Sequence, residues 1–181
     1  NGAVAGYSID NSLRFNDDSS ESLDKTFSSA GNRRTFTWSS WIKFGNNPTT
    51  SQSVFLGFNG ATQLGFSQIG FTSNKFYFSG WSYLWLQTTQ VFRDTSAWYH
   101  FILAVDTTQA TADDRIKMYV NGLQITDFGT RNNPSQNDEL AINDATTHNI
   151  GSRDAVDSTD RFDGYMAEIN FVDGQQLTPT S

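Results

Sequence analysis

The residues with the clearest capacity for chemistry in this sequence are aromatic. Trp81, Tyr83 and Trp85 occupy alternate positions, so a strand through them would place three rings on one face. Trp41 lies on the polar side of another predicted strand. Exposed rings among Asn, Gln, Ser and Thr can stack on sugar rings, so these four residues are candidate glycan-binding residues. The alternative is that the stripe fills the core or a subunit contact, where aromatic residues also dominate.

The two histidines give no sign of catalysis. His100 and His148 have no cysteine partner, because the sequence contains none, and no serine occurs in a recognisable nucleophile motif. We therefore predict structural roles for both histidines. The lack of cysteine also excludes disulfides and paired-cysteine metal sites.

Charge and hydropathy exclude further classes of function. The formal net charge is -7, and the 12 basic residues are scattered, which disfavours nucleic-acid binding. No apolar run approaches the length of a membrane span, and no signal peptide is visible. The chain begins at Asn1 without a methionine, so we expect it to be a segment of a longer protein.

The elements that must position these residues are strands. Asn121-Gly122 between two alternating runs predicts a type I′ hairpin that pairs Val120 with Leu123 and Met118 with Ile125. The run from Trp98 to Val105 is apolar on both faces, which predicts a central strand covered on both sides.

Many short strands with regular turn signals predict an all-β fold, a two-sheet antiparallel β-sandwich or jelly roll. Residues 1–10 are expected to form a linker or docking arm and residues 11–181 the folded domain; residues 128–147 read as a long polar connection. In the last strand Tyr165, Ala167, Ile169 and Phe171 are expected on one face. The other predicted strands are Ser12–Phe15, Leu23–Phe27, Thr35–Phe44, Val54–Phe58, Leu64–Phe71, Asn74–Ser79, Trp81–Thr88, His148–Gly151 and Phe162–Val172.

Six motifs in a fixed order carry a family resemblance. They are SLRF from Ser12, TFTWSSWIKF from Thr35, WYHFILAVD from Trp98, IKMYVNG from Ile116, HNIG from His148 and FDGYMAEINFVDG from Phe162. Together they resemble the laminin-G/pentraxin-like branch of the concanavalin A-like lectin and glucanase fold, in the versions found in structural proteins of tailed marine phages. The resemblance implies two curved sheets, with partners bound on the concave face or at the loop rim.

The resemblance also implies a calcium site at the rim. Asn59, Asp154 and Asp160 fall at or near positions where pentraxin-like members place oxygen ligands, and calcium takes six to eight oxygens. Arg153 occupies another such position, which would degrade the site. The alternative is a solvated acidic loop on an acidic protein.

An enzyme is the least favoured class. Glucanases of this fold need two carboxylates flanking the scissile bond, and none of Glu21, Glu139 and Glu168 has a carboxylate two residues away. The resemblance instead implies a non-catalytic, lectin-like module on a phage virion surface that binds host or environmental glycans. It would contact other virion proteins and form a homo-oligomer through the parent chain. The alternative is a purely structural decoration or oligomerisation domain without a ligand.

Overall fold

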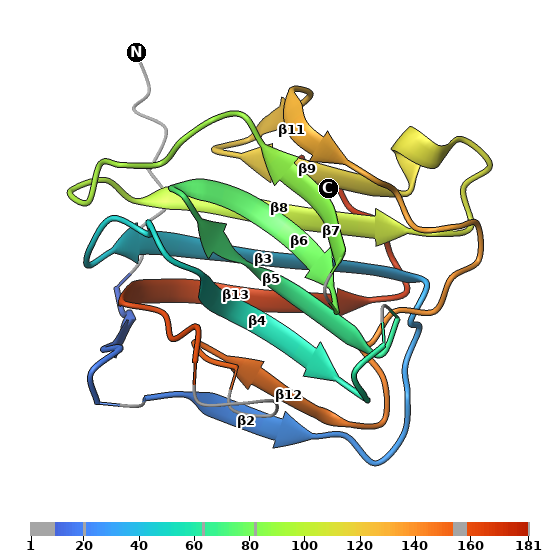
Figure 1. Cartoon of the computed structure of the whole chain (residues 1–181), viewed down its shortest axis with the longest axis horizontal. Coiled ribbons are helices and arrows are strands. Elements are labelled where there is room, and N and C mark those ends of the chain that lie inside the picture. The colour runs from blue at the N-terminus through green and yellow to red at the C-terminus, as the bar shows by residue number, and fades with distance from the viewer. Residues whose placement is uncertain (1–9, 20, 63, 82, 154–158, 181) are drawn as a thin grey trace, which may run out of the picture.

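The chain folds into two antiparallel sheets packed face to face (Figure 1). The computed structural model describes residues 10–19, 21–62, 64–81, 83–153 and 159–180, and only the backbone of residues 83 and 84. Sheet A has the strand order β1-β13-β3-β8-β9-β10, and sheet B the order β11-β7-β6-β5-β4-β12-β2. The predicted all-β sandwich is confirmed. Within the described ranges no helix has the length and apolar character needed to cross a bilayer.

Sheet A is formed by β1 (Leu13–Phe15), β3 (Thr35–Phe44), β8 (Tyr99–Asp106), β9 (Ile116–Val120), β10 (Leu123–Ile125) and β13 (Gly164–Asp173). Sheet B is formed by β2 (Leu23–Thr26), β4 (Gln52–Phe58), β5 (Phe66–Thr72), β6 (Lys75–Gly80), β7 (Tyr83–Thr88), β11 (Phe128–Arg131) and β12 (Thr147–Ile150). One short 3-10 helix, η1 (Ala112–Asp114), precedes β9.

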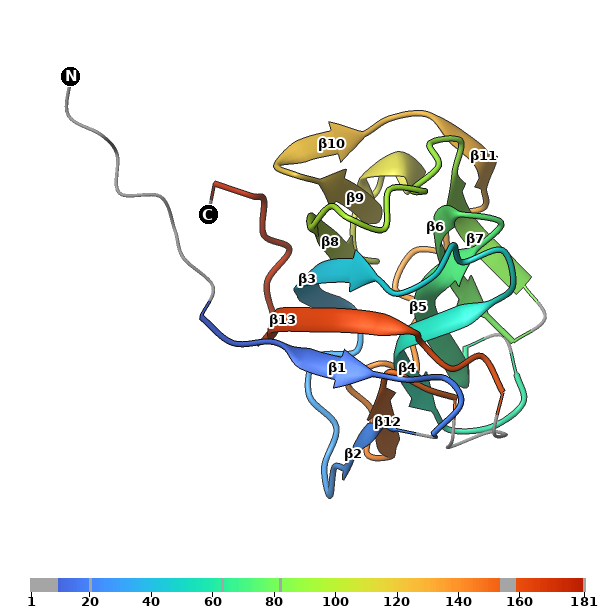
Figure 2. The ribbon, with the colours of Figure 1, turned by 90° about the vertical axis from the view of Figure 1, so that its left-hand side faces the viewer.

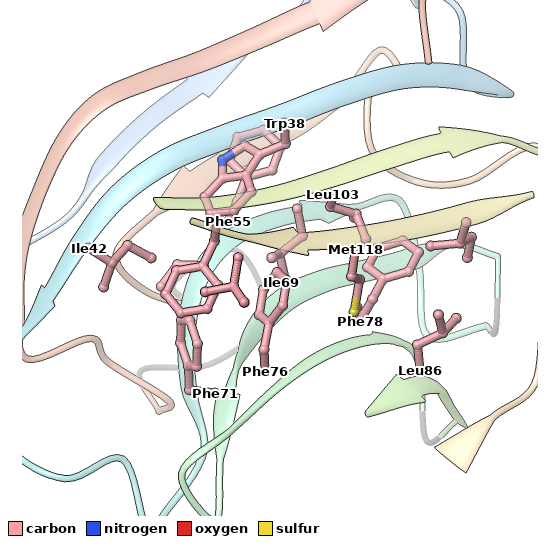
Figure 3. Close-up of a cluster of buried hydrophobic side chains, with 14 of the residues drawn as sticks. Trp38, Ile42, Phe55, Ile69, Phe71, Phe76, Phe78, Leu86, Leu103 and Met118 are labelled. Carbon is pink, nitrogen blue, oxygen red and sulfur yellow. The ribbon is translucent and has the colours of Figure 1, made fainter. Parts of the chain in front are cut away.

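The core lies between the two sheets and is rich in aromatic rings (Figure 3). In β3 the side chains at alternate positions, Phe36, Trp38, Ile42 and Phe44, are at most 1% exposed and face sheet B. The predicted bounds and facing of this strand are confirmed. Rings on the two sheets contact each other directly, as Phe101 does with Phe71 at 4.9 Å between centroids.

The hairpin at Asn121-Gly122 also has the predicted register. Val120 pairs with Leu123 and Met118 with Ile125. Both turn residues have the positive φ that a type I′ turn requires, 49° for Asn121 and 82° for Gly122. The side chain of Asn121 additionally accepts a hydrogen bond from the backbone N–H of His100 at 2.8 Å, which ties the turn to β8.

The outer face of sheet A is partly covered by the segment that follows β13. Gln176 donates to the backbone oxygen of Ala104 at 3.4 Å, and Thr37 donates to that of Gln175 at 2.7 Å. Beneath it, Ile102, Ala104 and Tyr119 form a small second apolar cluster, so β8 is buried on both faces as predicted. Figure 2 shows this segment running along the sheet A side of the molecule, away from sheet B.

Two features differ from the sequence prediction. The connection from residue 128 contains a strand, β11, which pairs with β7 and extends sheet B. In β13 a bulge at Glu168, which has a φ of 49°, shifts the register between Ala167 and Asn170. The bulge turns Ile169 towards the core while Tyr165 stays on the outer face, so the predicted single face of the last strand is wrong.

Candidate functional site

The outer face of sheet B carries an open cleft of about 480 Å³. Its floor is formed by β5 and β6, and its walls include Trp81, which follows β6, and Arg153 and Asp160, which follow β12. Its lining residues are Ser51, Phe66, Gln68, Thr72, Tyr77, Ser79, Gly80, Trp81, Arg153 and Asp160.

The alternation of β5 and β6 determines the floor. In β5 the side chains of Ile69 and Phe71 enter the core, so Gln68 points to the opposite face and into the cleft. Gly70 pairs with Tyr77 of β6, and a Cβ added at Gly70 would lie only 2.9 Å from the Tyr77 hydroxyl oxygen. The glycine therefore leaves room for the Tyr77 ring to lie across β5.

A polar network runs across this floor. The hydroxyls of Tyr77 and Ser51 are 2.9 Å apart, and Ser51 donates its proton to Asp160 at 2.9 Å. Tyr77 is therefore the donor to Ser51. Asp160 also accepts from Arg153 at 3.0 Å and from Gln68 at 3.5 Å. The network fixes a carboxylate and a guanidinium in the cleft as a pair of zero net charge.

Burial sets the protonation state of the tyrosine. Tyr77 is 4% exposed, and this desolvation raises the pKa of its hydroxyl well above the ordinary value. The hydroxyl therefore remains a donor throughout the physiological range. Arg153 and Asp160, by contrast, keep about a fifth of their side chains exposed, at 20% and 19%, so part of each side chain remains accessible.

Aromatic rings form the wall of the cleft. Trp81 is partly exposed and packs against Phe66 in an edge-on arrangement with centroids 5.6 Å apart. The guanidinium of Arg153 lies 5.3 Å from the centre of the Phe66 ring. The cleft thus combines an aromatic surface with hydrogen-bonding groups, the combination that recognises a ligand with both apolar faces and hydroxyl edges.

The predicted aromatic stripe does not form one exposed surface. Trp85 is fully buried and packs on Phe78 at 4.8 Å, so its prediction as a ligand-binding residue is wrong. The physical reason is a register shift between β6 and β7, in which Trp85 has no partner residue and the alternation is interrupted. Tyr83 is in β7 with its backbone paired to Gly80, and its side chain lies outside what the structure describes. Of the three residues, Trp81 lines the cleft.

Trp41 lies on the opposite face of the sandwich. It points outward from sheet A and stacks on His100 with centroids 5.0 Å apart. Together with Trp98 and Pro179 it lines a separate shallow hollow. Trp41 and Trp81, which were predicted together as glycan-binding residues, therefore lie on the outer faces of different sheets.

Two of the three predicted calcium ligands, Asn59 and Asp160, have protein partners in the structure. The amide of Asn59 donates to Asp144 at 2.6 Å, whereas Asp160 belongs to the cleft and is paired with Arg153. Asp154 lies outside the described residues. In the part of the chain that the structure describes, no three His, Cys, Asp or Glu side chains gather into a group that could hold a metal ion.

The His148 ring makes hydrogen bonds to the backbone of the turn between Asn143 and Thr146. The ring must be neutral to accept one of them. Its Nε2 accepts from the backbone N–H of Asn143 at 2.9 Å, and its Nδ1 lies 3.2 Å from the oxygen of Thr146. Burial lowers the pKa of this ring. The unfolded chain therefore binds the proton more readily than the folded one, and protonation favours unfolding.

We expect the unfolding free energy to fall as the pH drops below about 6.5, the ordinary pKa of histidine, and this loss to end below the folded-state pKa. Urea unfolding at pH 8, 6 and 5 measures the effect. In His148→Gln, whose amide oxygen can accept from Asn143, this part of the pH dependence should disappear. An equal slope in both proteins would contradict the role of His148.

These features define a class of protein, a concanavalin A-like β-sandwich with a cleft on one sheet. The profile of the concanavalin A-like lectin/glucanases superfamily matches residues 10–180. The chain therefore belongs to this family, in agreement with the resemblance found in its sequence motifs. A search of curated proteins gives no match.

Solved structures of similar shape are distant in sequence. Domain 4 of AbnA, an extracellular GH43 arabinanase of Geobacillus stearothermophilus solved with arabinotriose, is 22% identical with a TM-score of 0.58, covering 84% of this chain and 65% of that chain. Mouse laminin alpha1 domains LG4-5 are 12% identical with a TM-score of 0.62, covering 96% and 44%. A pentraxin of Limulus polyphemus is 13% identical with a TM-score of 0.58, covering 83% and 68%. At these identities the likeness establishes the fold.

Proposed function

We propose that this domain binds a neutral oligosaccharide in the cleft of sheet B and does not cleave it. The observation that carries the proposal is the placing of Trp81 and Phe66 beside the Tyr77–Ser51–Asp160–Arg153 network. A sugar ring presents an apolar face that can stack on an indole, and hydroxyls that can exchange hydrogen bonds with a carboxylate and a guanidinium.

Two further points support the proposal. The Arg153–Asp160 pair has no net charge, which suits an uncharged ligand better than an acidic or basic one. In most families of glycoside hydrolases, catalysis uses two carboxyl groups roughly 5–10 Å apart. Among the described residues that line the cleft, Asp160 is the one carboxylate, and it is paired with Arg153. The arabinotriose bound by the AbnA domain shows that a distant member of the fold binds a neutral oligosaccharide.

The setting of the domain is part of the same proposal. The resemblance of the sequence motifs to structural proteins of tailed marine phages supports a place on a virion surface, where the cleft would meet glycans of a host cell or its surroundings. The competing function is structural decoration or oligomerisation, without a ligand. Sugar binding in the cleft distinguishes the glycan-binding function from the structural one.

Calorimetric titration with arabino-, xylo- and gluco-oligosaccharides and with host-surface polysaccharides tests the proposal. For a glycan that binds, Trp81→Ala should weaken binding at least about tenfold, because the stacking surface is lost. Trp98→Ala is the matched control, since Trp98 is an exposed tryptophan on the sheet A side. No binding across the panel would favour the structural function. Binding that survives in Trp81→Ala but not in Trp98→Ala would place the site on sheet A.

A further inference from the structure

A second pocket lies between the two sheets, at the edge where they part. Its volume is about 230 Å³. Figure 1 shows β2 and β12 at this edge, below β13. The lining residues are Leu23, Asp24, Lys25, Phe27, Trp38, Phe55, Asn143, His148, Ile150, Ile169 and Phe171, which share no member with the cleft of sheet B.

The β13 bulge shapes one wall of this pocket. After the register shift at Glu168, Phe171 pairs with Trp38 of β3, and its ring centroid lies 5.9 Å from that of Phe55 in sheet B. Ile169, which lies within the shift, packs against the core between the sheets. On the other side, β2 forms the edge of sheet B. Its Leu23 is 47% exposed, and the next residue after the strand's end, Phe27, is 39% exposed. Large apolar side chains therefore stand at the mouth, and such exposed apolar surface is typical of a binding groove.

One residue that lines this largely apolar pocket, Trp38, has a buried polar atom without a partner. Trp38 is 0% exposed, and its indole N–H has no hydrogen-bond acceptor among the described residues. Figure 3 shows the Trp38 ring projecting from sheet A towards Phe55 of sheet B, another lining residue. A buried tryptophan N–H normally has an acceptor, because leaving it without one costs free energy. A ligand that brings an acceptor oxygen to Trp38 would recover that free energy.

We infer that this pocket binds a compact apolar molecule that carries one hydrogen-bond acceptor, such as an aromatic ketone. Its volume exceeds the roughly 150 Å³ cavity that holds benzene. It falls below the roughly 300–1,000 Å³ typical of sites for drug-sized ligands. Sugars do not fit this chemistry, because most of their hydroxyls would face Phe and Ile side chains without partners. The pocket is thus a second site, independent of the proposed glycan cleft.

Two pairs of probes test the acceptor directly. Acetophenone and ethylbenzene have nearly the same shape, and so do 2-acetonaphthone and 2-ethylnaphthalene, but only the ketones carry an acceptor. Titrations followed by nitrogen–proton NMR report on the indole N–H groups of the five tryptophans, with Trp38 assigned from Trp38→Phe. We expect at least one ketone to bind about tenfold more tightly than its hydrocarbon and to shift the Trp38 signal most.

The variants then locate the site. Trp38→Phe keeps an aromatic ring without the donor, so the ketone should bind only as well as the hydrocarbon. Ile169→Phe fills the pocket from β13 and should weaken both compounds, whereas Trp98→Phe, on the outer face of sheet A, should change neither. A Trp38 signal that stays in place with both ketones would overturn the inference. So would equal affinity for ketone and hydrocarbon, or binding that Ile169→Phe leaves unaltered.

Discussion

Replacing Phe101 with alanine is expected to lower the unfolding free energy by about 3–5 kcal/mol, the usual cost of removing a buried phenylalanine ring. Phe101 is fully buried in β8, in the middle of sheet A. Its ring centroid lies 4.9 Å from the centroids of Phe71, Phe76 and Phe92. Two of these rings come from sheet B, so the truncation would open a cavity at the contact between the sheets.

Urea unfolding of the two proteins measures this difference. Leu123→Ala is the matched control, because Leu123 is a large apolar side chain that is 74% exposed at the hairpin. Its loss should change stability by less than about 0.5 kcal/mol. A Phe101→Ala effect below about 1 kcal/mol would mean that the two sheets do not depend on this ring for their packing.

Replacing Arg33 with methionine should cost about 2–3 kcal/mol. The Arg33 side chain donates to the backbone oxygen of Leu140 at 2.7 Å and pairs with Asp144 at 3.2 Å. Breaking a fully buried ion pair costs about 3–5 kcal/mol, because the remaining charge loses its partner. Arg33 is 21% exposed and Asp144 9%, so the loss is reduced, yet the buried residues Leu140 and Ile142 would lose the anchor of their loop.

The neighbouring residue provides the control. Arg34 pairs with Glu139 at 2.8 Å, but both side chains are well exposed, at 44% and 50%. Arg34→Met should therefore change the unfolding free energy by less than about 1 kcal/mol. Unfolding midpoints of the two variants, measured side by side at one salt concentration, separate the two roles. Equal effects would show that burial of Asp144 does not govern the energy of this network.

Local signals predicted the regular parts of the fold. The alternation of Thr35–Phe44 and the Asn121-Gly122 turn each depend on neighbouring residues alone, and both have the predicted register. The strand Phe128–Arg131 was missed because its short, polar sequence has no alternation of its own. It is a strand because β7 offers it an open edge, and that information lies some forty residues earlier in the chain.

Bulges limited how well the sequence could predict which face of a sheet each side chain occupies. Period-two reasoning assumes an unbroken strand, and one unpaired residue reverses the facing of every residue after it. Trp85 in β7 and Glu168 in β13 are such positions. The bulge in β7 places the ring of Trp85, a predicted ligand-binding residue, in the core. The bulge in β13 places Ile169 and Phe171 in the wall of the pocket between the sheets.

The cleft itself is built from distant segments. Ser51 contacts Tyr77, 26 residues away, and Asp160, 109 residues away. Trp81 was predicted for this role from its ring, but Phe66, Tyr77 and Arg153 were not. The alternation of Phe66, Gln68 and Thr72 could have identified one face of β5. Nothing local indicates that Arg153 and Asp160 lie beside that face.

The segment that crosses sheet A bears on how the domain can be mounted on something larger. Figure 2 shows β1 and the chain beyond β13 together on the sheet A side, while β5 and β6 lie across the molecule. The final described residues stay close to this side, since Pro179 contacts the hollow beside Trp41. Strand β1 and the final described residues thus lie at the back of the sandwich. A partner bound to this back face would leave the cleft on the opposite sheet exposed.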